Sequence, residues 1–212
     1  SIDQKYFFTY LNGYKYTYEG KIDQGINSYR HVFDNSQNRK YKHRAAVSLI
    51  NLYAFTRDWK SGFKYLDYIN EVSEQIHEQE LRHNGWITSA IFYNELGLYD
   101  LVLLNVQRLR DEAVAGRNAC FTNSIEVKAK VALKLESLDS DYIDAMLKSC
   151  RAINEVIIAN DIIYSYARHQ IENNQFEHLR HSVLLQSSAN GNVISYNYSK
   201  NPYWTGVFLP SN

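Results

Sequence analysis

The chain has 212 residues, of which 45% are hydrophobic, and its 23 basic and 23 acidic side chains balance. Balanced charge argues against a nucleic-acid-binding surface, which is usually strongly basic, and no run of 18 apolar residues could span a membrane. Because the chain begins with Ser1 and shows no signal-peptide pattern, we expect it to be a processed or excised piece of a longer protein.

Apolar side chains recur along the chain at helical spacing. One pattern, with offsets 0, 3, 4, 7 and 10, begins at Ile22, Trp59, Tyr99, Tyr142 and Phe176. A second helical pattern precedes each of these and ends six residues before it, at Tyr16, Tyr53, Tyr93, Glu136 and Gln170. The five starts lie 37, 40, 43 and 34 residues apart by subtraction, a period typical of stacked helical hairpins.

The stretch from residue 46 to residue 72 shows this arrangement best. Two apolar helix faces are separated only by Thr56-Arg57-Asp58, which is long enough for a tight turn and no more. Asp58 is a predicted N-cap of the second helix. Small residues at Ala46 and Gly62 would let the two helices approach closely.

These patterns predict an all-α fold, a right-handed α-solenoid of about five helical hairpins over residues 1–186. The turn-forming cluster at residues 187–192 should end the fifth hairpin. Residues 187–212 then form a partial repeat or capping tail that is rich in aromatic side chains. We expect this tail to cover the exposed face of the last hairpin or to bind a second copy of the chain as a homodimer.

The hairpin patterns resemble the tetratricopeptide repeat (TPR) family over about 165 residues. The family's order of bulky, small, aromatic and glycine positions is matched well by two stretches, Ala46-x6-Tyr53-x5-Trp59-x2-Gly62 and Trp86-x3-Ala90-x2-Tyr93-x3-Gly97-Leu98-Tyr99. The resemblance implies TPR-like hairpins whose first helices line a concave groove.

Four segments are also similar to the repeat-containing sensor region upstream of bacterial GGDEF-type diguanylate cyclases. They are Tyr93-Asn94-Glu95-Leu96-Gly97-Leu98-Tyr99-Asp100-Leu101, Arg117-Asn118-Ala119-Cys120, Cys150, and Ile157-Ile158-Ala159-Asn160. The cyclase motif itself does not occur in this chain. The resemblance therefore implies a signalling module that senses a ligand and carries no catalytic residues.

Two pairs of histidines are close enough in the sequence to be candidate metal ligands. His77 and His83 are six residues apart, which places them on different helix faces, whereas a zinc-binding pair needs spacing i, i+4. His178 and His181 share a helix face but have no third ligand in view. We therefore predict no metal site.

Other chemical signatures point away from an enzyme. The chain has no glycine-rich phosphate loop, nucleophile elbow or paired-carboxylate pattern, so we expect no catalytic activity and no cofactor. The basic run at residues 39–44 could contact phosphates, but such runs are more often the solvated start of a helix. We expect no nucleic-acid partner.

Cys120 and Cys150 are the only cysteines. If both belong to the fourth hairpin, its antiparallel helices would bring them to the same end. They could form a disulfide, which would fit a periplasmic or other extracytoplasmic location, or they could be two buried thiols in a cytoplasmic protein.

The groove of a hairpin stack is lined by first helices, at positions just beyond their core faces. The predicted groove residues are Tyr10, Tyr14, Tyr18, Asn51, Phe55, Asn94, Glu95, Lys130, Lys134, Tyr164, Arg168 and Glu172. Such a mixed lining suits a peptide, a protein segment or a small polar ligand. Two functions follow: an extracytoplasmic ligand-sensing module, or a cytosolic adaptor or regulator domain that grips a partner's peptide.

Overall fold

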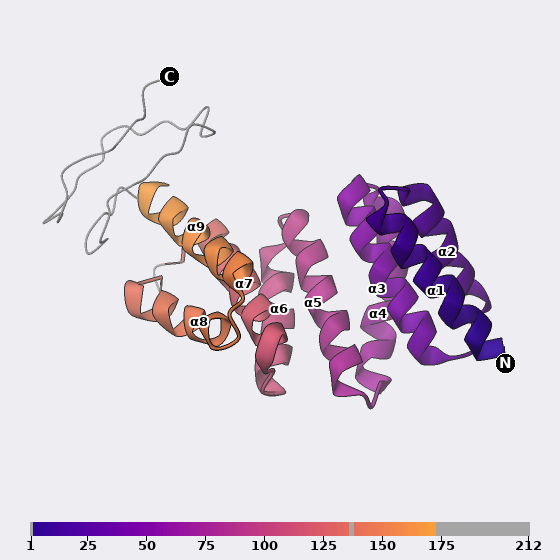
Figure 1. The fold of residues 1–212 in the computed structure, drawn as a ribbon. Helices are drawn as coiled ribbons and strands as arrows, with labels where there is room; N and C mark the ends of the chain where they lie inside the picture. The colour runs from indigo at the N-terminus through magenta and orange to yellow at the C-terminus, as the bar shows by residue number, and fades with distance from the viewer. Residues whose placement is uncertain (1, 136–137, 173–212) are drawn as a thin grey trace, which may run out of the picture.

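The computed structural model describes residues 2–135 and 138–172, and this part of the chain is all α (Figure 1). Its nine α-helices are α1 Ile2–Tyr18, α2 Ile22–Asn35, α3 Arg39–Thr56, α4 Trp59–Val72, α5 Gln79–Glu95, α6 Tyr99–Asp111, α7 Gly116–Ala132, α8 Ser140–Ala152 and α9 Val156–Glu172. A short 3-10 helix, Ser73–Gln75, follows α4. Three predicted second helices begin at the expected residues, Ile22, Trp59 and Tyr99.

The helices pack as sequential antiparallel pairs, α1–α2, α3–α4, α5–α6 and α7–α8, which follow one another along the molecule (Figure 1). Each first helix also packs against the next first helix, from α1 through α3, α5 and α7 to α9. Within the described residues, the backbones of the second helices lie farther apart and these helices touch through long side chains, as Phe33 of α2 does with Tyr65 and Tyr68 of α4. The odd-numbered helices therefore form one continuous layer.

The same backbone turn closes all four pairs. The residue after each first helix, or one position further on, has left-handed φ: Gly20, Arg57, Gly97 and Lys134, at +75°, +59°, +73° and +53°. The next residue's N–H then donates to the carbonyl of the residue five positions earlier, as Asp58 does to Tyr53 at 3.0 Å. Asp58 also caps α4, because its side chain accepts a hydrogen bond from the Ser61 N–H at 3.2 Å.

Aromatic side chains dominate the core of the first five helices. Tyr53 and Tyr65 stack with ring centroids 5.8 Å apart, and the edge of Phe33 meets Tyr65 at 4.9 Å. Phe92 of α5 is fully buried over Gly62 of α4. A Cβ at Gly62 would lie 2.5 Å from the Phe92 ring, so this glycine is what lets the second and third hairpins approach.

The fourth hairpin departs from the predicted register. Helix α7 ends at Ala132 and α8 begins at Ser140, where Asp139 caps it, so Leu133 does not continue the first helix. Glu136, where the predicted first helix ends, lies outside the described residues. The buried face of α8 is Ile143, Leu147 and Cys150, one residue beyond the stripe predicted from Tyr142. The physical reason is the length of the connection at residues 133–139, since the other pairs are joined by turns of two or three residues. A longer connection changes the number of residues between the apolar faces of the two helices, so the repeat spacing no longer predicts which residues are buried.

Helix α9 shows a similar shift. Its buried side chains include Ile158, Ile162, Ser165 and His169. Of the predicted pattern, Gln170 is buried as expected, whereas Ile163 is half exposed. The predicted pattern in this helix depended on the position of Phe176, which lies outside the described residues. The predicted second helix of the fifth hairpin and the tail at residues 187–212 also lie outside them.

Candidate functional site

A cavity of about 470 Å³ lies against four successive first helices; we call it the N-terminal cavity. Tyr10 comes from α1, and the rest of the lining comes from the N-terminal and middle parts of α3, α5 and α7. Its residues are Tyr10, His43, Arg44, Val47, Asn51, Glu80, Leu81, Asn84, Ile87, Thr88, Ile91, Asn118 and Phe121. The volume is within the range of small-ligand sites.

His43 is the most unusual residue of this lining, because it is fully buried and neither ring nitrogen has a hydrogen-bond partner among the described residues. Burial lowers its pKa to about 4, with a smaller contribution from the charge of Arg44, so the imidazole is neutral at pH 7. A neutral imidazole presents one donor and one acceptor. Gly85 makes room for the ring, since a Cβ there would lie 2.9 Å from His43 Nε2.

Three asparagine side chains from three helices share this cavity. They are Asn51 of α3, Asn84 of α5 and Asn118 of α7, and their carboxamides are not engaged by other described residues. Arg44 and Glu80 also line the cavity, and neither forms an ion pair within the described residues. Their opposite charges sum to zero. The lining therefore mixes polar and apolar side chains and has no net charge.

A second cavity, of about 550 Å³, lies near the other end of the same helix layer; we call it the C-terminal cavity. It is lined by the C-terminal part of α5 and the start of α6, by α7 and the turn after it, and by α9. The residues are Asn94, Tyr99, Lys128, Val131, Ala132, Lys134, Asp161, Tyr164, Ser165 and Arg168. No residue lines both cavities.

Six of the twelve predicted groove residues line one of these two cavities. Tyr10 and Asn51 line the N-terminal cavity, and Asn94, Lys134, Tyr164 and Arg168 line the C-terminal one. The sequence analysis missed His43, Asn84 and Asn118. Extending the helical stripe back from Asn51 by two steps of four residues would have reached His43.

The other predicted groove residues line neither cavity. Tyr14, Tyr18 and Phe55 are 64%, 87% and 74% exposed, and Glu95 is also exposed, so their part in binding stays a prediction. Glu172 is the last residue of α9, and its side chain lies outside the described part of the structure.

Lys130, another predicted groove residue, lines neither cavity, and its ammonium is engaged between α7 and α8. Its Nζ lies 2.9 Å from Glu126 Oε1 and donates to the Tyr142 hydroxyl at 2.9 Å, between α7 and α8. Tyr142 and Arg110 also donate to Glu126, both at 2.7 Å. Burial opposes ionisation of Glu126, but these hydrogen bonds outweigh it and hold its pKa below the usual value. Lys130 is recruited because a buried carboxylate needs partners.

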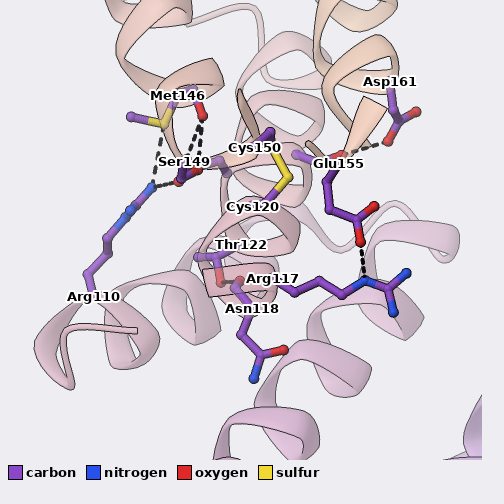
Figure 2. Close-up of a disulfide and its surroundings, with 12 residues drawn as sticks. Arg110, Arg117, Asn118, Cys120, Thr122, Met146, Ser149, Cys150, Glu155 and Asp161 are labelled. Carbon is purple, nitrogen blue, oxygen red and sulfur yellow. Dashed lines mark hydrogen bonds and ion pairs between the residues drawn. A yellow bond between two sulfur atoms is a disulfide. The ribbon is translucent and has the colours of Figure 1, made fainter. Parts of the chain in front are cut away.

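Cys120 of α7 and Cys150 of α8 form a disulfide, with Cα atoms 4.9 Å apart (Figure 2). Beside it, Arg117 Nε lies 2.7 Å from Glu155 Oε1, which ties the start of α7 to the turn before α9 (Figure 2). Asn118 and Phe121, which flank Cys120 in the sequence, line the N-terminal cavity. The disulfide therefore supports one wall of that cavity.

Neither a protein-family model, nor a curated protein, nor a solved structure matches this chain. Among residues 2–135 and 138–172, no helix combines the length and apolar character needed to cross a bilayer. In the same part of the chain, no three His, Cys, Asp or Glu side chains gather closely enough to hold a metal ion.

Proposed function

We propose that this chain is a non-catalytic, ligand-sensing module whose N-terminal cavity binds a peptide or a small ligand rich in amide groups. The observation that carries the proposal is the convergence of Asn51, Asn84 and Asn118, from three successive hairpins, on one uncharged cavity. Each carboxamide can donate and accept hydrogen bonds, which is the pattern that matches another amide.

Two further features support a ligand of this kind. His43 is neutral at pH 7, so it adds no charge to the cavity wall, which favours an uncharged ligand. The apolar side chains of Val47, Ile87 and Phe121 lie among the polar ones and would contact the non-polar parts of a ligand.

We further propose that the hairpins belong to a right-handed, TPR-like solenoid of about five units. Close backbone packing of the odd-numbered helices, with the even-numbered ones farther apart and touching through long side chains, supports a stack curved toward the first helices. The turn residues Gly20, Arg57, Gly97 and Lys134 lie 37, 40 and 37 residues apart by subtraction, which supports a repeat period.

The resemblance to sensor regions of GGDEF-type signalling proteins suggests what such a module would serve. Ligand occupancy would alter an output domain elsewhere in the protein. The Cys120–Cys150 disulfide supports an extracytoplasmic location, since disulfides persist mainly in oxidising compartments.

The binding test uses a library of short peptides acetylated at the N-terminus and amidated at the C-terminus, screened by ligand-observed NMR. We expect binders whose affinity falls about three- to tenfold in Asn84→Ala and in Asn118→Ala, the effect of one lost hydrogen bond of about 0.5–1.5 kcal/mol. Asn27→Ala, an exposed position on α2, is the matched control and should bind normally. A library without binders, or binders indifferent to both cavity variants, would contradict the proposal.

A further inference from the structure

We propose that the N-terminal cavity and the aromatic side chains beside it bind a proline-rich protein segment in the polyproline II conformation. This inference rests on the proposed function, since it names the class of peptide that the amide-lined cavity takes. It also adds a surface that the cavity does not include. This surface consists of the exposed rings of Tyr14, Tyr18 and Phe55, which we call the aromatic strip.

The aromatic strip continues two walls of the cavity along their helices. Tyr14 and Tyr18 follow Tyr10 of α1 by four and eight residues. Phe55 follows Asn51 of α3 by four residues. Side chains four residues apart lie on the same face of a helix, one turn from each other. Because Tyr10 and Asn51 line the cavity and α1 packs against α3, the strip and the cavity form one continuous surface.

The three asparagines of the cavity are open to a ligand. Asn51 is exposed, and Asn84 and Asn118 are partly exposed. Each carboxamide nitrogen can donate a hydrogen bond to a peptide carbonyl. A polyproline II segment makes no internal hydrogen bonds, so its carbonyls are free to accept, and proline has no N–H that would need an acceptor. The asparagine donors therefore match what a proline-rich backbone offers.

The spacing of the first helices matches the repeat of such a segment. A polyproline II helix has about three residues per turn and rises about 3.1 Å per residue, which gives about 9 Å per turn. Packed helices lie roughly 8–10 Å apart. Asn51, Asn84 and Asn118 come from α3, α5 and α7, and each of these helices packs against the next. A segment that crosses the layer can therefore meet one asparagine in each turn.

The aromatic strip favours proline over other residues. Segments in the polyproline II conformation bind to grooves lined by aromatic rings, and their fixed backbone loses little conformational entropy on binding. Tyr10 joins the strip to the cavity and is itself held in place. Its ring lies 5.3 Å from that of Tyr29, and its hydroxyl lies 3.3 Å from Ser48 Oγ. The cavity lining has no net charge, which disfavours a strongly acidic or basic peptide.

The first test compares two peptides that are acetylated at the N-terminus and amidated at the C-terminus, nonaproline and a glycine–serine peptide of the same length. Isothermal titration calorimetry measures their binding to the whole chain. We expect saturable binding of nonaproline, about tenfold tighter than that of the flexible glycine–serine peptide.

Variants of the aromatic strip show whether it takes part. Tyr14→Ala and Phe55→Ala should each weaken nonaproline binding about five- to tenfold, because each removes an aromatic anchor. Both rings are exposed, so the variants should keep the circular dichroism spectrum of the wild type. Tyr164→Ala, at an exposed position on α9 outside this surface, is the matched control and should bind nonaproline normally.

A length series tests the match between turns and helices. Capped oligoprolines of three, six and nine residues offer about one, two and three turns, so affinity should rise about three- to tenfold at each step. Asn118 lies on α7, at the end of the cavity away from the aromatic strip. Nonaproline should therefore bind Asn118→Ala about as tightly as hexaproline binds the wild type.

The outcomes separate this inference from the proposed function. Absence of saturable nonaproline binding, a glycine–serine peptide bound equally tightly, or binding unaffected by Tyr14→Ala and Phe55→Ala would overturn the inference. If other library peptides still bind and depend on Asn84 and Asn118, such a failure removes only the proline-rich class of ligand. A library without any binder that depends on these two asparagines contradicts the proposed function itself.

Discussion

The first five helices and the last three share the hairpin arrangement but are stabilised by different interactions. In the N-terminal region, aromatic rings pack against one another, as Tyr53 does on Tyr65, and Phe92 packs closely over Gly62. In the C-terminal region the core is mainly aliphatic and is reinforced by the Cys120–Cys150 disulfide. The ionic network around Glu126 adds a third kind of contact there. The same architecture thus tolerates quite different cores, provided that each pair of helices buries one face.

The two cavities follow the same contrast. The N-terminal cavity has amide side chains and a neutral histidine, whereas the C-terminal cavity has an excess of cations. Because the odd-numbered helices form one layer, that layer carries two cavities with chemically different linings. Differences between hairpins, rather than the repeat itself, therefore determine what each part of the layer can bind.

The largest expected effect tests the aromatic core of the N-terminal region. Phe92→Ala should lower the free energy of unfolding by about 3–5 kcal/mol, because it leaves a cavity over Gly62 that rigid helices cannot fill. Urea unfolding monitored by circular dichroism measures this loss. Phe55→Ala, at a 74% exposed position, is the control and should change little. Equal stability of the two variants would show that Phe92 is not a core residue.

A slightly smaller loss is expected in the C-terminal region when the disulfide is removed. Replacing Cys120 and Cys150 together by Ala should cost about 3 kcal/mol, because the bond closes a loop whose ends are 30 residues apart. The same urea titration applies. A thiol count on the denatured, unreduced wild-type protein provides the control: it should find no free thiol, and a count of two would contradict the structure.

The smallest expected effect is a pH dependence confined to the N-terminal region. The pKa of His43 is about 4 in the folded protein and near 6.5 unfolded, so the unfolded chain binds more protons between these values. Stability is then fully present above pH 6.5 and falls with acidification, by about 2 kcal/mol between pH 7.5 and pH 5. The pKa of Glu126 is lowered from 4.5, so the C-terminal network keeps its charge over this range.

Urea unfolding at both pH values, compared between the wild type and His43→Gln, isolates this contribution. All other side chains are the same in both proteins, so their contributions cancel in the comparison. The variant should lose about 2 kcal/mol less than the wild type on acidification. An identical pH dependence in the two proteins would mean that His43 is not kept neutral by burial.

Much of the fold was predictable from the sequence, because helical periodicity reports local backbone geometry. The starts of α2, α4 and α6 and the cap at Asp58 were found from spacing alone, since tight turns preserve the register from one helix to the next. The register of α8 was missed by one residue. A longer connection at residues 133–139 interrupts the periodicity, and no local pattern encodes its length.

The site depended on tertiary structure. The sequence placed Asn51 and Lys134 on the layer of first helices but could not show that they belong to different cavities. No sequence pattern indicated that Lys130 would form an ion pair with the buried Glu126. Nor did any pattern indicate that His43 would be buried without a hydrogen-bond partner among the described residues. Such outcomes depend on how closely α3, α5 and α7 approach. The distance between two helices is determined by contacts such as that of Gly85 with His43. These two residues are about 40 positions apart in the sequence, so no local pattern predicts their contact.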